Sequence, residues 1–170
     1  MKVYAQRFNT YLLLAMVLAL SGGCQTGGKD GNIGALSVHL QAPAIGNAET
    51  VTLLRNAPLT VRIAHDPVLT QFDVNGATVV NTPGGFAVAV QFDDDGTLNL
   101  EQYTSSNIGR HLVIYGQWGD QAGDARWLAA PGIPQRISNG MLIFTPDCSR
   151  EEADKLVAGL NAAAKKNKKK

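Results

Sequence analysis

The stretch from residue 85 to residue 114 constrains the fold more than any other part of the chain. Phe86, Val88, Val90 and Phe92 alternate with smaller or more polar residues, which is the pattern of a strand with one buried face. Three aspartates follow, and carboxylates at a helix start accept bonds from free backbone N–H groups. A second apolar run ends the stretch. The stretch 85–114 therefore predicts a strand, a helix and a strand in succession, as in half of a split βαβ motif.

The helix predicted inside this unit has its own start and stop signals. Leu100 is spaced to face a sheet, and Asn107 with Gly109 is typical of a helix end because both residue types adopt the left-handed backbone conformation. The aspartates Asp93 to Asp95 also resemble the start of a calcium loop. The alternating carboxylates and the distal glutamate of such a loop are missing, so we predict a helix start there and no metal site.

The remaining chain carries further strand patterns and a second helix. Strands are expected at 36–40, with Ser37 and His39 facing outward, and at 51–54, 59–64, 77–80, 127–130 and 140–144. Ser149 and Glu152 have the spacing of a capping box, and the apolar residues after them form one helical face, which should fray by Lys165. The expected architecture is an α+β fold, an antiparallel sheet with two helices packed on one face.

The N-terminal residues predict an export signal. A positively charged start precedes the apolar run 11–20, which has the length of a signal-peptide core and is too short to span a bilayer. The small residues before Cys24 resemble a bacterial lipobox, in which the cysteine sulfur receives a diacylglycerol. This resemblance implies a lipoprotein signal peptide over residues 1–23 and lipidation of Cys24. Cleavage by an ordinary signal peptidase after Ser21, which would release the protein without a lipid, is the alternative.

The cysteines and the segment after Cys24 bear on the same choice. Cys148 is the other cysteine, and two cysteines in an oxidising compartment could form a disulfide. Residues 24–34 are glycine-rich and polar, so we interpret them as a flexible tether, which is a poor place for a structural disulfide. Lipidation is therefore the favoured fate of Cys24, and it would leave Cys148 as a single buried thiol.

Charge is distributed unevenly between the body and the end of the chain. Residues 35–164, the predicted folded domain, hold seven basic and thirteen acidic residues. A nucleic-acid-binding domain would instead carry clustered Lys and Arg, so no nucleic-acid partner is expected. Residues 165–170 contain five lysines and are interpreted as a solvated, disordered tail. Contact with anionic lipid or a cell-wall polymer is the alternative for this tail.

Several residues resemble the head subdomain of the first periplasmic domain of SecD, the membrane subunit that assists Sec-dependent protein export. Gly96, Thr104, Asn107 and Gly109 match the family pattern inside the strand, helix, strand unit. Pro131 lies in a segment similar to the family's later strand and proline run. The resemblance, which covers residues 73–160, implies an export-related α+β head domain, here as a stand-alone lipoprotein. Thr104 and Asn107 are expected to be structural, with ligand contact as the alternative.

A polar loop over residues 116–126 is the place where we expect a partner to bind. Trp118 and Trp127 flank the loop, and tryptophans with an arginine such as Arg126 are typical of binding edges. Burial of at least one of the two tryptophans in the core is nevertheless the favoured expectation.

Catalytic and metal-binding patterns are missing. His39, His65 and His111 are far apart and lack the spacing of metal ligands, and His65–Asp66 is the one close histidine–acid pair. The chain has no phosphate-binding loop or nucleophile motif. We therefore predict no cofactor, no metal and no enzymatic activity, and a hydrolase is disfavoured.

These features predict a protein of the cell envelope that faces the periplasm through a lipid anchor. Gln25, rather than an aspartate, follows Cys24, which favours the outer membrane. The expected function is binding of exported polypeptides or of an envelope protein partner. A purely structural role in an envelope complex, without any client, is the alternative.

Overall fold

A computed structural model describes residues 34–46, 48–53, 56–121 and 123–168. The predicted signal peptide, Cys24, most of the tether and the last two lysines lie outside these described residues. The helices and strands, in chain order, are β1 (Ala35–Leu40), β2 (Glu49–Leu53), β3 (Leu59–Ile63), β4 (Leu69–Thr70), the short 3-10 helix η2 (Gln71–Asp73), β5 (Val74–Thr82), β6 (Gly85–Phe92), α2 (Asp94–Ser106), β7 (Leu112–Gln117), β8 (Ala125–Ala129), β9 (Met141–Phe144) and α3 (Arg150–Asn167).

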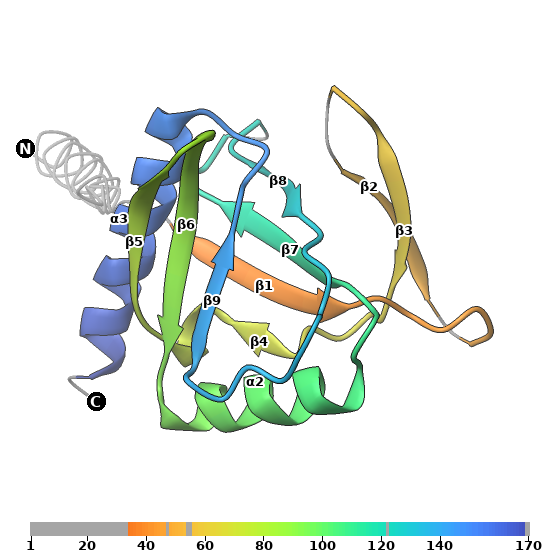
Figure 1. Ribbon diagram of the computed structural model, residues 1–170. Helices are drawn as coiled ribbons and strands as arrows, with labels where there is room; N and C mark the ends of the chain where they lie inside the picture. Colours follow the sequence, from red (N-terminus) through yellow and green to blue (C-terminus); the bar gives the residue numbers. More distant parts are fainter. Residues whose placement is uncertain (1–33, 47, 54–55, 122, 169–170) are drawn as a thin grey trace, which may run out of the picture. The chain divides into compact units, whose positions relative to one another are not determined.

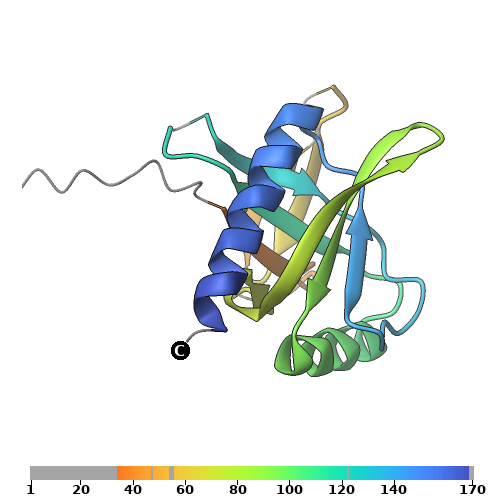
Figure 2. The same ribbon diagram turned by 90° about the vertical axis from the view of Figure 1, so that its left-hand side faces the viewer.

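The described strands form three antiparallel sheets. One has the order β4-β1-β7-β8, a second has the order β5-β6-β9, and β2 pairs with β3 in a separate hairpin. In Figure 1, α3 runs alongside β5 and α2 runs below the two larger sheets; Figure 2, turned by 90°, shows α3 from the front. The predicted α+β class with antiparallel strands and two helices is confirmed, although the strands are divided among separate sheets.

The strand, helix, strand unit forms as predicted, but its two strands belong to different sheets. β6 pairs with β5 and β9, whereas β7 pairs with β1 and β8. Helix α2 therefore carries the chain from one sheet to the next. Asp93 caps this helix, because its Oδ1 accepts a hydrogen bond from the Gly96 backbone N–H at 2.8 Å. Among the described residues, no group of acidic, histidine or cysteine side chains could hold a metal ion.

The end of α2 is tied to the segment between β8 and β9. Asn107 is the C-cap residue, and Gly109 has a φ of 84°, which glycine adopts without strain. The buried Thr104 hydroxyl donates to the carbonyl of Leu100 at 2.6 Å and accepts from the backbone N–H of Ile137 at 2.9 Å. Thr104 thus bonds back to the helix, as expected, and also holds the β8–β9 connection.

Replacing Thr104 by valine is expected to lower the free energy of unfolding by about 1–3 kcal/mol. Valine keeps the shape but leaves the Ile137 N–H without its acceptor, and an unsatisfied buried donor costs roughly that amount. Urea denaturation of the variant measures the change. Ser105→Ala is the control, since this neighbouring hydroxyl is exposed and donates to the carbonyl of Gln102. Equal stability of Thr104→Val and the wild type would contradict the assigned role.

The core has two parts. The larger part lies between the two larger sheets and the helices, and its buried members include Phe92, Leu128 and Leu156. The smaller part lies where the β2–β3 hairpin covers the four-stranded sheet at Val113. His39 pairs with Val113 across β1 and β7, so it shares the covered face and is buried. The prediction that His39 faces outward is therefore wrong, because the hairpin shields this face.

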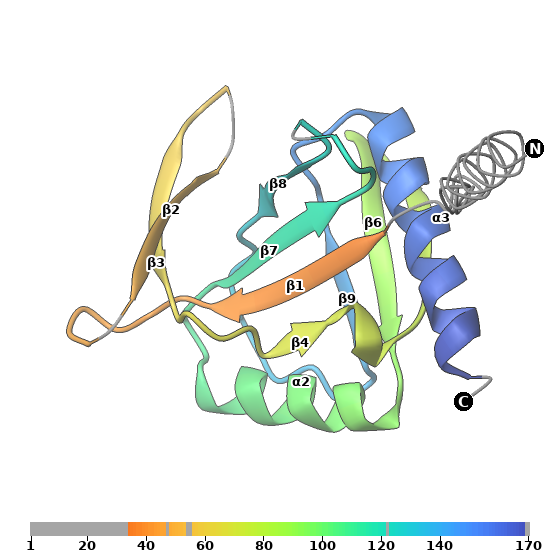
Figure 3. The same ribbon diagram turned by 180° about the vertical axis from the view of Figure 1, so that it is seen from behind.

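Helix α3 begins as predicted and ends later than predicted. Ser149 and Glu152 form the capping box, with the Ser149 Oγ accepting from the Glu152 N–H at 3.2 Å. The helix continues through Lys165 to Asn167, and its buried residues include Leu156 and Leu160. Figure 3 shows α3 from behind, along the side of β5 and β6.

Candidate functional site

The residues of the predicted binding loop have different environments. Because β7 extends to Gln117 and β8 begins at Ala125, the connection is shorter than expected. Trp118 is only 4% exposed and packs in the larger core, while the Arg126 guanidinium lies 4.8 Å from the centre of its ring. Trp118 therefore stabilises the fold and cannot belong to an exposed binding edge. The expectation that at least one tryptophan is buried is confirmed.

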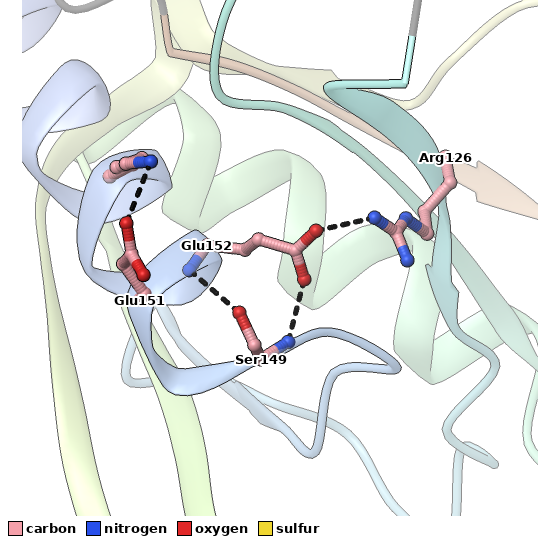
Figure 4. Close-up of polar contacts among 5 residues, drawn as sticks. Arg126, Ser149, Glu151 and Glu152 are labelled. Carbon is pink, nitrogen blue, oxygen red and sulfur yellow. Dashed lines mark hydrogen bonds and ion pairs between the residues drawn. The ribbon is translucent and has the colours of Figure 1, made fainter.

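Arg126 joins β8 to the start of α3. Its Nη2 lies 2.6 Å from Oε1 of Glu152, and Oε2 of the same carboxylate accepts from the Ser149 N–H at 2.7 Å (Figure 4). Burial by itself raises the pKa of Glu152, but the hydrogen bonds from Ser149 and the charge of Arg126 outweigh burial and leave the pKa below its ordinary value of 4.5. Glu152 is thus a structural carboxylate that remains ionised in mild acid.

Replacing Glu152 by glutamine is expected to lower the free energy of unfolding by about 1–2 kcal/mol at neutral pH, since hydrogen bonds to a charged group are lost. Because the folded pKa lies below the unfolded value, this stabilisation is complete above pH 4.5 and is lost as the pH falls through the folded pKa. The difference between wild type and variant should shrink in that range, which denaturation at several pH values measures. Glu151→Gln is the control, because Glu151 pairs with the exposed Lys155. A difference independent of pH would contradict this account.

Arg126 and Trp127 also line a cleft of about 360 Å³ beside the β2–β3 hairpin. The Trp127 ring packs edge-on against Tyr115 and His39, with centroid distances of 5.2 and 5.3 Å. Leu53 and Pro58 contribute from the hairpin side. Two of the three predicted loop residues, Arg126 and Trp127, therefore line one concave surface. Both are also held by other contacts, Arg126 by its ion pair with Glu152 and Trp127 by packing against aromatic rings.

A larger groove lies between the end of β8 and strand β9, and sequence reasoning missed it. It has a volume of about 490 Å³ and is lined by small or apolar side chains with two threonines: Thr82, Ala87, Ala129, Ala130, Pro131, Ile143, Phe144 and Thr145. The Asp147 N–H donates to the carbonyl of Leu128 at 2.8 Å, which joins the segment after β9 to β8. We name it the β8–β9 groove.

Strand β9, which lines this groove, has backbone hydrogen-bonding groups that do not pair with β6. Strand β9 is the edge of its sheet, and the Phe92 N–H donates to the carbonyl of Gly140 at 2.9 Å. In an antiparallel pair, inward and outward backbone groups alternate, so Leu142 and Phe144 bond to β6 while Met141 and Ile143 point away from it. The Met141 N–H is accepted by the Asn139 side chain. The N–H and C=O of Ile143 are consequently directed away from β6, and Ile143 is one of the residues that line the groove.

The surface around this edge is apolar. Ile143 is 53% exposed, and Met141, on the same face of β9, is also exposed. The alanines on the facing wall leave room for a main chain to approach. Pro131 has no N–H, and its carbonyl accepts from Leu112 at 3.0 Å, so Pro131 contributes shape to the wall. An apolar groove with an open strand edge is suited to an extended polypeptide.

The other predicted signature residues lie away from the groove. Gly96 is at the start of α2, where a Cβ would come within 2.9 Å of the Asp73 Cβ, and Asn107 and Gly109 are at the end of the same helix. Thr104 does not line the groove, and its hydroxyl accepts from Ile137 in the β8–β9 connection. No single-sequence pattern marked Ile143, because a short apolar strand does not reveal whether it lies inside or at the edge of a sheet.

Comparison with known proteins identifies relatives of the fold. A family model for the SecDF P1 head subdomain matches residues 48–164. The structure described as the membrane component SecDF that enhances protein export is similar, with a TM-score of 0.56 and 21% identity over 78% of this chain and 64% of that one. SecDF in a super-membrane-facing form gives a TM-score of 0.56 and 23% identity over 78% of this chain and 19% of that one. No curated protein matches the chain.

The chain thus spans less than two thirds of either SecDF structure. Within the part of the chain that the structure describes, no helix is both long and apolar enough to cross a bilayer.

Proposed function

The chain belongs to the SecDF P1 head subdomain family, and we propose that it is a lipid-anchored, non-catalytic protein of the bacterial cell envelope that binds extended polypeptides on the periplasmic side. One of the similar structures is described as a membrane component that enhances protein export, which supports an export-related role. The export activity of the complete SecDF assembly is not part of the proposal. Handling of an emerging chain is the part that a head domain could supply.

The observation that carries the proposal is the open edge of β9 in the β8–β9 groove. The outward N–H and C=O of Ile143 offer a main-chain pairing site, and the alanines and Pro131 of the facing wall offer apolar contact. Strand addition of this kind obtains affinity from the backbone and therefore tolerates many sequences. Tolerance of sequence is what a binder of exported polypeptides requires.

Site-specific photocrosslinking in cells tests this function. A photoreactive residue at Ile143 should capture many different exported chains while they are being translocated, and capture should fall when secretion is blocked. Ile108 is the control position, because its side chain is 60% exposed and follows the far end of α2. Capture from both positions alike would argue against a specific groove.

A second outcome supports the competing function. Capture of one fixed envelope protein from Ile143 would favour an assembly role without clients. A parallel probe at Gln121, in the loop between β7 and β8, tests whether the polar loop contributes.

The anchor is a separate part of the proposal and rests on the lipobox-like residues before Cys24. Cys24→Ser is expected to abolish incorporation of labelled fatty acid and to shift the protein from the membrane fraction. Gln25 favours the outer membrane, which density-gradient fractionation of the two membranes would test. Retention of label in the Cys24→Ser variant would contradict acylation at this residue.

A further inference from the structure

The C-terminal end of α3 and helix η2 together form a basic surface with an exposed aromatic side chain. Lys165, Lys166 and Lys168 are exposed at the end of α3. Phe72 in η2 is 67% exposed, and its carbonyl lies 3.5 Å from Nδ2 of Asn167, which places the phenyl-bearing residue beside the lysines. We name Phe72, Lys165, Lys166 and Lys168 the basic end.

We propose that the basic end binds the surface of a membrane that contains anionic phospholipids. Lysines attract anionic headgroups, and an exposed aromatic ring beside them can enter the boundary between headgroups and acyl chains. A nucleic acid fits less well, because the folded body between residues 35 and 164 has an excess of acidic residues. The proposal does not require acylation of Cys24 and goes beyond polypeptide binding.

Gly34, the first described residue, packs against helix α3, which also carries the lysines of the basic end. Gly34 packs so closely on α3 that a Cβ at this position would collide with the backbone of Gly159 and Leu160. The chain therefore enters the domain beside α3, within about 14 Å along the helix from the lysines, given a rise of 1.5 Å per residue. The chain before Gly34 and the basic end thus meet the domain at the same helix, α3. A lipid anchor on that chain and a membrane contact at the basic end would both hold the domain by α3.

Carboxylates near the basic end oppose this attraction. The Asp93 N–H donates to the carbonyl of Asp73, so the start of α2, with Asp94 and Asp95, lies beside η2. The Asp73 carboxylate accepts from the backbone N–H and the hydroxyl of Thr70, and Asp93 is occupied as the N-cap. Asp94 and Asp95 are exposed, so neutralising them should increase membrane binding.

Binding to vesicles tests the proposal with residues 24–170 carrying Cys24→Ser, because the apolar run 11–20 of the predicted signal peptide would itself partition into any vesicle. Each lysine near an anionic surface contributes about a fivefold gain in partitioning, so replacing all three by glutamine should lower partitioning onto vesicles with 40 mol% phosphatidylglycerol by about a hundredfold. Replacement by arginine should retain binding. The control removes the same number of positive charges elsewhere, as Arg136→Gln, Arg150→Gln and Lys155→Gln, and should change partitioning less.

The site of contact is tested with brominated lipids, which quench nearby tryptophan. Phe72→Trp should be quenched on anionic vesicles at low salt, and the lysine-to-glutamine changes should abolish this quenching. Ile108→Trp, at the far end of α2, should not be quenched. Equal quenching at both positions, equal binding to neutral vesicles, or binding to heparin without binding to vesicles would overturn the proposal.

Discussion

Replacing Ile143 by proline is expected to lower the affinity for an extended polypeptide at least tenfold, with a change of less than about 1 kcal/mol in the free energy of unfolding. The outward N–H of Ile143 makes no ladder bond with β6, so proline removes a group that only a bound chain would use. One main-chain hydrogen bond contributes about 1 kcal/mol net, and the ring also obstructs the approaching strand. Together these effects reach the 1.4 kcal/mol of a tenfold loss.

Fluorescence anisotropy with a labelled, unfolded polypeptide measures the affinity, and urea denaturation measures the stability. Ile143→Val keeps the N–H and most of the apolar surface, so it should bind almost as well as the wild type. Leu142→Pro is the opposite control, because it removes a bond to β6 and should destabilise the domain. Full binding by Ile143→Pro would exclude strand addition at this edge and would redirect attention to the cleft beside Trp127.

Replacing Leu156 by alanine is expected to lower the free energy of unfolding by about 2–5 kcal/mol, the range for a buried leucine that leaves a cavity. Leu156 is fully buried on α3 in the larger core. The Leu156 side chain packs against β7 at Gly116, where the lack of a side chain leaves room for it. A Cβ at residue 116 would lie 3.3 Å from Leu156 Cδ2. The lost contacts would therefore weaken the attachment of α3 to the four-stranded sheet.

Urea denaturation of Leu156→Ala and Val157→Ala provides the comparison. Val157 is the next residue on the helix and is only partly buried, so its truncation should cost less. Similar losses for both variants would contradict the packing described for α3. A change in the denaturant slope would indicate that the variant alters the unfolded or native state rather than only the core.

Local signals predicted the helices well. Asp93, Ser149 and Glu152 cap helix starts with side chains that reach backbone groups three residues away, and Gly109 allows a backbone conformation that other residues avoid. Such interactions depend on neighbours in the chain, so they can be inferred from one sequence. The strand patterns were equally local, and each expected strand overlaps an observed one.

Partners far apart in the chain decided the candidate site. Ile143 is available for strand pairing only because β9 has a neighbouring strand on one side, and Pro131, which lines the same groove, comes from the segment after β8. Trp118 was a candidate for a binding edge, but it is buried in the larger core under Arg126. His39 was expected to face outward, but the β2–β3 hairpin covers its side of the sheet.

The sequence by itself determined the elements, the starts of the two helices α2 and α3 and the α+β class, because hydrogen bonding and side-chain periodicity within a segment are properties of that segment. Only the tertiary structure decided which strand is an edge, which aromatic ring is covered and which lysines lie beside Phe72. Those properties depend on which surfaces meet, and a surface is buried only when a second one is packed against it.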